Sequence, residues 1–146
     1  MADTDTDEIV DVLNSIVELE LAGAVRYTQY SLMVFGHARI PITGWMREQA
    51  AESLAHAVLA GEEVTTLGAK VSLGIGELVG THHATVDEMM EEMLLHERAG
   101  IALYQRLHDL RAGRHIPLEE YARQMIRNEE LHVGEIQKML RTRGDA

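Results

Sequence analysis

The residues that interrupt helices are few in this chain, and most of them gather at three places. Only two prolines occur, Pro41 and Pro117. Most of the glycines collect at residues 36–44, at 68–80 and at Gly113. Because proline and glycine mark turns and helix ends, each of the long stretches between these places can form one continuous helix.

Four such helices are predicted, at about residues 7–35, 43–70, 85–112 and 117–141. Thr85 and Glu88 form a capping box at the start of the third helix, and Pro117 suits the first position of the fourth. The connections are short, long and short, and the middle one is long enough to cross a bundle. This pattern predicts an all-α, ferritin-like four-helix bundle with one long crossover between the second and third helices and no fifth helix. We expect one domain, residues 1–146.

The composition of the chain limits the kinds of partner that such a bundle can bind. The chain has no cysteine and a formal net charge of −11. Without thiolates, a metal must bind through histidine, aspartate or glutamate, and a cytoplasmic location is expected. The excess of acid argues against a nucleic-acid partner, since phosphate binding needs clustered lysine and arginine. No membrane partner is expected, because no apolar run reaches the length of a span and the acidic N-terminus does not resemble a targeting segment.

Carboxylates interrupt the apolar seams of three predicted helices. Steps of three and four residues place Glu20, Glu97 and Glu129 near the middle of the first, third and fourth helices, on the inward face. Buried carboxylates are costly, so three at similar depth need cations, protonation or metal to compensate them. Glu129 and His132 have the spacing with which one helix supplies a carboxylate and an imidazole to a dinuclear centre. These ligands suit iron or manganese, and zinc is also allowed.

The second helix departs from this spacing. Its histidine is His56, but the nearest preceding acid is Glu52, and Ser53 occupies the position three residues before the histidine. Three interpretations stay open. In the first, Glu52 binds metal from a shifted position, for example across a π-bulge. In the second, Glu52 accepts a hydrogen bond from the ligand histidine and orients it without binding the metal. In the third, the two metal positions are unequal and one of them binds metal weakly.

Taken singly, these residues have ordinary explanations, because a Glu-x-x-His pair is common by chance on a solvent face. The combination of Glu20, Glu97 and Glu129 on inward seams favours a dinuclear site. The competing explanation is that the inward faces of the helices are assigned incorrectly. Tyr27, two turns beyond Glu20, is expected near the site as a partner for a ligand carboxylate, although a core tyrosine with an ordinary partner explains it equally well.

Four segments of the chain resemble bacterioferritin. They are LELAGAVRY, HAVLAGEEVTTLG, LLHERAGI and RNEELHVGEIQ, and the similarity runs from about Val17 to Met139. The resemblance implies a tyrosine beside the site at Tyr27 and two iron ions per chain. The resemblance also implies that the iron ligands of a ferroxidase site lie at Glu20, His56, Glu97, Glu129 and His132.

Three departures from the bacterioferritin pattern limit this resemblance. The bridging glutamate of the second helix falls on Ser53, so Glu52 must replace it or the chemistry must differ. The methionine that binds haem between subunits falls on Leu54, so no haem is expected. The short fifth helix of the storage cage has no counterpart, so the expected homo-oligomer is a dimer that buries one bundle face or a larger assembly, up to the family's 24-subunit shell.

The expected function is therefore the binding and oxidation of Fe(II) by a ferroxidase-type oxidoreductase, with O2 or H2O2 as the electron acceptor. Its catalytic residues are Glu20, Glu97, Glu129 and Tyr27, and its metal ligands are Glu20, Glu52, His56, Glu97, Glu129 and His132. The alternative is a non-storage metal-binding protein or scaffold dimer with an incomplete or mononuclear site.

Overall fold

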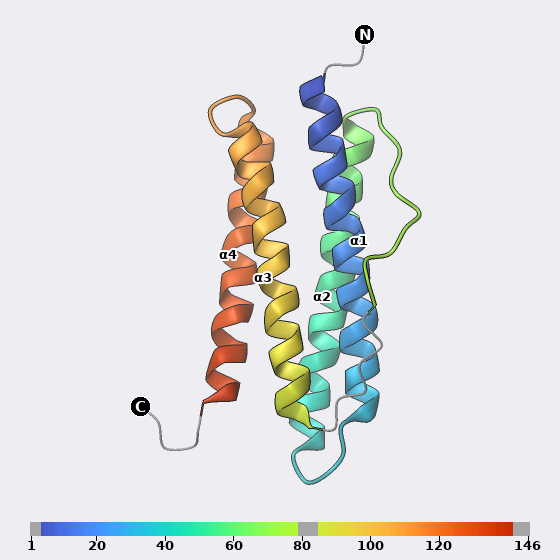
Figure 1. Cartoon of the computed structure of the whole chain (residues 1–146), viewed down its shortest axis with the longest axis vertical. Helices are drawn as coiled ribbons and strands as arrows, with labels where there is room; N and C mark the ends of the chain where they lie inside the picture. The colour runs from blue at the N-terminus through green and yellow to red at the C-terminus, as the bar shows by residue number, and fades with distance from the viewer. Residues whose placement is uncertain (1–3, 79–84, 142–146) are drawn as a thin grey trace. The chain divides into compact units, whose positions relative to one another are not determined.

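The computed structural model describes residues 4–78 and 85–141, and α-helix is the only regular secondary structure within them. The helices are α1 (Thr4–Met33), α2 (Arg39–Thr66), α3 (Val86–Arg111) and α4 (Ile116–Leu140) (Figure 1). The chain divides into two compact units, Met1–Gly80 and Thr81–Ala146. The first contains the antiparallel pair α1 and α2, and the second contains the antiparallel pair α3 and α4 (Figure 1). That residues 1–146 form a single domain stays a prediction.

No helix in the described ranges combines the length and the apolar character that crossing a membrane would require.

The turn between α1 and α2 is shorter than predicted, because α2 begins at Arg39. Gly36 has a φ of 101°, which suits glycine and lets the chain reverse. Pro41 lies in the first turn of α2, where its missing N–H has no helical partner to lose. The Arg39 guanidinium reaches back to the carbonyl oxygens of Ser31 and Val34. It thereby places a cation at the C-terminal end of α1, where helical carbonyls are free.

α2 ends at Thr66, before the predicted boundary near residue 70, because Gly68 adopts a left-handed conformation with a φ of 77°. The Gly68 N–H donates to the Thr65 carbonyl at 2.9 Å, and the Ala69 N–H donates to the Val64 carbonyl at 3.2 Å. These two bonds make a Schellman motif, which satisfies carbonyls of the last turn and stops the helix.

After α2 the chain continues as an extended segment along α1, residues 69–78, which we call the strap (Figure 1). Asn14 of α1 holds the beginning of the strap. Its Nδ2 donates to the Lys70 carbonyl at 3.1 Å, and its Oδ1 accepts from the Ser72 N–H at 2.9 Å. The predicted crossover therefore starts as a segment fixed to α1, while its residues 79–84 lie outside the described residues.

The strap is attached to α1 a second time near its end. The Gly76 N–H donates to the Glu18 carbonyl oxygen at 2.8 Å. Arg26 donates to the Glu77 carbonyl oxygen at 2.7 Å. Because α1 carries Glu20 between these two contact residues, the strap supports the part of α1 that bears a candidate ligand.

Side-chain caps start both helices of the second unit. Thr85 accepts a hydrogen bond from the Glu88 N–H at 3.1 Å, so the predicted cap of α3 is present. His115, to which the sequence assigned no role, caps α4 by accepting from the Leu118 N–H at 3.2 Å. Pro117 is consequently the second helical residue of α4 and not the first.

The buried face of each helix follows the predicted steps of three and four. On α1, α3 and α4 the steps join apolar residues and place one carboxylate near the middle, as expected. The residues that line these stripes include Ile9, Leu13, Ile16, Glu20 and Tyr27; Met90, Met93, Glu97 and Tyr104; and Leu118, Ala122, Met125, Glu129 and Ile136.

Candidate metal centre

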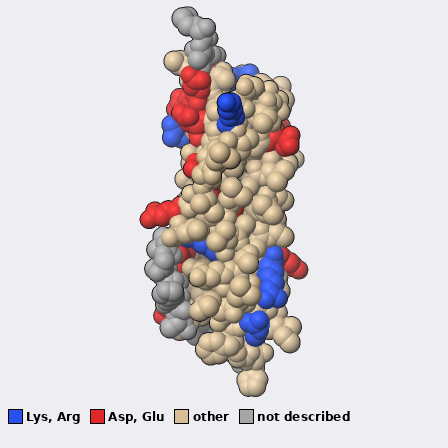
Figure 2. Space-filling view, turned by 90° about the vertical axis from the view of Figure 1, so that its right-hand side faces the viewer, with Lys and Arg blue, Asp and Glu red and all other residues tan. Residues whose placement is uncertain are grey.

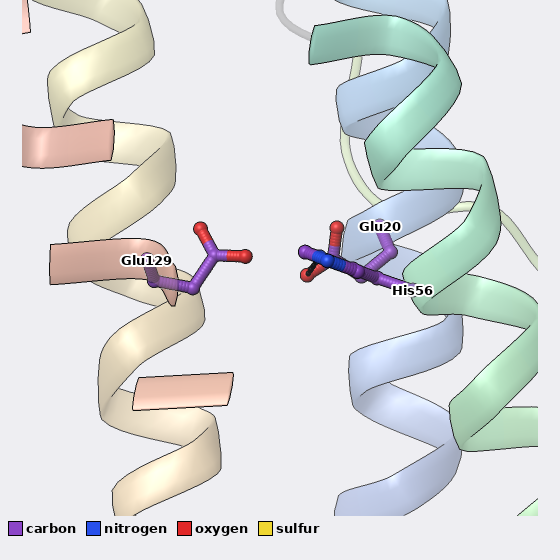
Figure 3. A group of neighbouring side chains, drawn as sticks. All are labelled: Glu20, His56 and Glu129. Atoms are coloured by element: carbon purple, nitrogen blue, oxygen red, sulfur yellow. Dashed lines mark ion pairs between the residues drawn. The ribbon is translucent and has the colours of Figure 1, made fainter. Parts of the chain in front are cut away.

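In the first unit, α1 and α2 bring a buried carboxylate and a buried imidazole together. Glu20 is 3 % exposed and His56 is 5 % exposed. The two side chains point toward each other, and 3.7 Å separates His56 Nδ1 from Glu20 Oε1 (Figure 3). A carboxylate oxygen and an imidazole nitrogen in this arrangement are a suitable pair of ligands for iron, manganese or zinc. Glu129, also labelled in Figure 3, belongs to the second unit.

Glu52 contacts the other ring nitrogen of His56. Its Oε1 lies 3.5 Å from His56 Nε2, and its side chain is 37 % exposed. α2 is regular α-helix throughout this region, so the π-bulge interpretation is wrong. The two nitrogens of an imidazole point away from each other, so a carboxylate at Nε2 orients the ring for a metal at Nδ1. The geometry favours the second of the three interpretations.

The buried stripe of α2 also contains two uncharged polar residues that precede His56. Ser53 is 6 % exposed and Gln49 is 8 % exposed. Among the described residues, neither side chain takes part in a hydrogen bond. Gln49 was missed by the sequence reasoning, although the steps from Met46 through Gln49 and Ser53 to His56 trace this stripe.

In the second unit, α3 and α4 bring together three of the predicted ligands. Glu97 is 4 % exposed, Glu129 is 2 % exposed, and the His132 side chain is 15 % exposed. His132 Nδ1 lies 3.6 Å from Glu97 Oε2 and 3.6 Å from Glu129 Oε2. The three residues offer ligand atoms within 4.8 Å of one another, a separation at which one metal ion can be held.

Burial and mutual contact shift the protonation of this group. The pKa of Glu97 is raised from 4.5 to about 7, chiefly by burial; the contact with His132 lowers it, and the neighbouring Glu129 raises it. Burial alone would lower the pKa of His132, but its contacts with Glu129 and Glu97 outweigh that effect and raise the pKa from 6.5 to about 10. At neutral pH the metal-free group therefore keeps a proton on His132, whose positive charge lies beside the two acidic side chains.

Tyr27, which was expected near the site, and Tyr104 of α3 are both fully buried. The ring of Tyr27 packs edge-on against Trp45, with ring centroids 5.8 Å apart. Tyr104 packs in the same manner against Tyr121 at 6.1 Å. These ring contacts explain the burial of both side chains, and the catalytic role assigned to Tyr27 stays a prediction.

Comparison with solved structures defines the class of fold. A ferritin-like, diiron-carboxylate protein from Bacillus anthracis has a TM-score of 0.90 at 21% identity, over 96% of this chain and 100% of that one. The dodecameric thioferritin of Bacteroides fragilis, a bacterioferritin-related protein, has a TM-score of 0.85 at 21% identity, over 92% and 85%. The diiron bacterioferritin of Desulfovibrio desulfuricans has a TM-score of 0.83 at 17% identity, over 96% and 83%. The protein is thus a ferritin-like four-helix bundle, as predicted, and the described residues contain no fifth helix.

The family is defined by the sequence itself. Residues 10–143 match the Ferritin family, described as the ferritin-like domain. The chain belongs to this family, so the resemblance to ferritin-like proteins is confirmed. A search of curated proteins finds no match.

Proposed function

We propose that this protein binds Fe(II) and oxidises it with O2 or H2O2. The observation that carries the proposal is the buried group of Glu97, Glu129 and His132, which joins two carboxylates and an imidazole at coordinating separations. Family membership and the diiron-carboxylate description of a relative support it.

In this proposal each unit contributes ligands for one of two iron ions. Glu20 and His56 serve one ion, and Glu97, Glu129 and His132 serve the other. Bound iron supplies the electrons, while the side chains set the ligand geometry and exclude water. Iron displaces the proton on His132, because an imidazole binds metal only in its neutral form. Glu52 orients His56 through Nε2, and Tyr27 lies in the buried stripe beyond Glu20.

The test is an anaerobic titration of the metal-free protein with Fe(II), followed by exposure to air. We expect two irons per chain and rapid formation of an absorbing Fe(III) product. Glu129→Ala should lose the second iron and most of the oxidation rate, since it removes a buried carboxylate from the group. Glu130→Ala is the matched control, because Glu130 is the exposed neighbour on the same helix.

One observation favours a second candidate, a metal-binding protein or scaffold with an incomplete site. Ser53 replaces a carboxylate at the position three residues before His56, so the first unit offers fewer ligands than the second. One tightly bound iron per chain, or none, with no oxidation on exposure to air would establish this alternative. Manganese and zinc titrations of the same metal-free protein identify the preferred ion.

We also propose that the chain assembles as a homo-oligomer, a dimer or larger. Leu54 and Val58 are one turn apart on α2 and are 51 % and 57 % exposed. Figure 2 distinguishes the acidic, basic and remaining residues on one face of the molecule. Exposed apolar side chains on one helix face are a common feature of subunit interfaces. Cytoplasmic location stays a prediction.

A further inference from the structure

The inward face of α2 carries polar side chains whose hydrogen-bonding capacity is unused. Gln49, Ser53 and His56 lie on one buried stripe. Ser53 and Gln49 are each more than nine-tenths buried, and neither takes part in a hydrogen bond among the described residues. Buried hydroxyl and amide groups are costly without partners. Neither side chain contributes to the fully enclosed, unpartnered polar atoms of the described residues, so both can reach a small polar group that enters beside the ligand histidine.

The charge of the proposed metal centre points to the kind of partner. In the first unit, Glu20 offers one negative charge to the divalent ion that Glu20 and His56 would hold, and that ion carries two positive charges. Dinuclear carboxylate centres in helical bundles use a fourth glutamate, in a Glu-x-x-His pair on the helix that here carries Ser53 and His56. An uncompensated charge in a buried site is unfavourable, so an ion held by Glu20 and His56 needs a further anionic ligand.

Glu52 does not supply this ligand. Its carboxylate faces His56 Nε2, while His56 Nδ1 faces Glu20. A side chain that is 37 % exposed keeps much of its hydration, which weakens its field at a buried ion.

We propose that a small external carboxylate, of the size of formate or acetate, binds beside Ser53 and supplies the missing anionic ligand of the metal centre. This inference rests on the proposed function, because it assumes that metal binds at Glu20 and His56. The external carboxylate binds the metal through oxygen and accepts hydrogen bonds from the Ser53 hydroxyl and the Gln49 amide. Its two oxygens reproduce the end of the glutamate side chain that position 53 lacks.

The test uses Co(II), whose visible absorption reports its ligands and which does not oxidise in this experiment. The metal-free protein is titrated anaerobically with Co(II) in formate and, separately, in chloride of equal ionic strength. We expect formate to tighten Co(II) binding by about tenfold or more and to change the Co(II) spectrum. Chloride should do neither, because it is not a carboxylate.

Variants identify the place of binding. Ser53→Glu carries its own carboxylate, so it should bind Co(II) more tightly without formate and gain nothing from formate. Ala55→Glu adds the same charge at an exposed position of α2 and should respond to formate as the wild type does. Gln49→Met keeps the side-chain length but removes the amide, and should lose much of the formate gain.

The outcomes separate this inference from the proposed function. Co(II) binding that is indifferent to formate overturns the inference and leaves the proposed function standing. Failure of the wild type to bind Co(II) in either salt overturns both. A formate gain that persists in folded Ser53→Glu overturns the inference, since formate then binds elsewhere. If Ser53→Glu does not fold, the broadening of the 13C resonance of formate by bound Co(II) is measured instead. The Co(II)-loaded wild type should broaden this resonance strongly, and Gln49→Met should not. Equal broadening by both proteins overturns the inference.

Discussion

At the residue scale, the second unit shows how buried carboxylates are tolerated before metal arrives. His132 lies 3.6 Å from an oxygen of both Glu97 and Glu129, so its proton compensates them. The group can hold either a proton on His132 or a metal ion. Because metal binding displaces that proton, metal uptake is coupled to proton release.

The metal-free protein should therefore lose stability as pH rises. The native pKa of His132 is raised from 6.5 to about 10, so its stabilising contribution is full below pH 6.5 and is lost by pH 10. The native pKa of Glu97 is raised from 4.5 to about 7, so its contribution is also lost as pH rises, between 4.5 and 7. Both groups bind protons more tightly in the native state, and the linkage has the same sign for both. We expect a lower Tm at pH 8.5 than at pH 5.5, measured with a chelator present.

A matched pair of variants isolates this effect. Glu97→Gln removes one titrating group and should flatten the change in Tm below pH 7, whereas Glu91→Gln, at an exposed position of α3, should leave it unchanged. A Tm of the wild type that rises between pH 5.5 and 8.5 would contradict the assignment of the proton to this group.

Glu52 gives a second prediction at this scale. Because its carboxylate faces His56 Nε2, Glu52→Gln should keep the number of bound metal ions and weaken their affinity by about tenfold. Glu48→Gln, at an exposed position of the same helix, is the control. The measurement is metal content per chain together with a competition titration against a chelator. Loss of a whole equivalent of metal at saturating concentrations would instead make Glu52 a direct ligand.

At the scale of the elements, the strap depends on a glycine in contact with α1. A Cβ at Gly76 would lie 2.9 Å from the Glu18 carbonyl oxygen and 3.2 Å from the Ala22 Cβ. Gly76→Ala should therefore displace the strap, break the bond from Gly76 N–H to Glu18, and cost about 1–3 kcal/mol. Denaturant unfolding measures this change in the free energy of unfolding.

Gly44→Ala is the matched control for the strap. Gly44 lies within α2, and a Cβ there meets nothing within 4 Å. Alanine is the better helix former, so the same substitution should raise the free energy of unfolding by about 0.5–1 kcal/mol. Equal effects at the two glycines would show that the close contact of the strap is unimportant.

At the scale of the whole molecule, the proposed assembly predicts that charged substitutions on the exposed apolar face of α2 weaken the contact between subunits. Leu54→Lys combined with Val58→Lys should shift the protein to smaller species, because two charges would have to be buried in the interface. Light scattering after size exclusion measures the mass, and circular dichroism checks that helix content is kept. Leu95→Lys, a single change on α3 at a residue 68 % exposed, should leave the mass unchanged. An unaltered mass in the double variant would place the interface elsewhere.

Helix periodicity made much of the fold predictable. The steps that place Glu20, Glu97 and Glu129 among apolar residues depend only on the 3.6-residue turn, and all three are buried. The start of α2 was not predictable in the same way. Pro41 and the surrounding breakers indicated a longer turn, but a proline in the first helical turn costs little, and Arg39 bonds back to α1.

The sequence by itself determined that the chain forms four helices with acids on their inward faces, because periodicity and capping are local properties. Only the tertiary structure decided that Glu52 faces Nε2 of His56, that Ser53 and Gln49 are buried on the same stripe, and that the strap is bonded to Glu18. These features depend on how each helix is rotated against its neighbour, and that rotation is set by contacts between residues far apart in the chain.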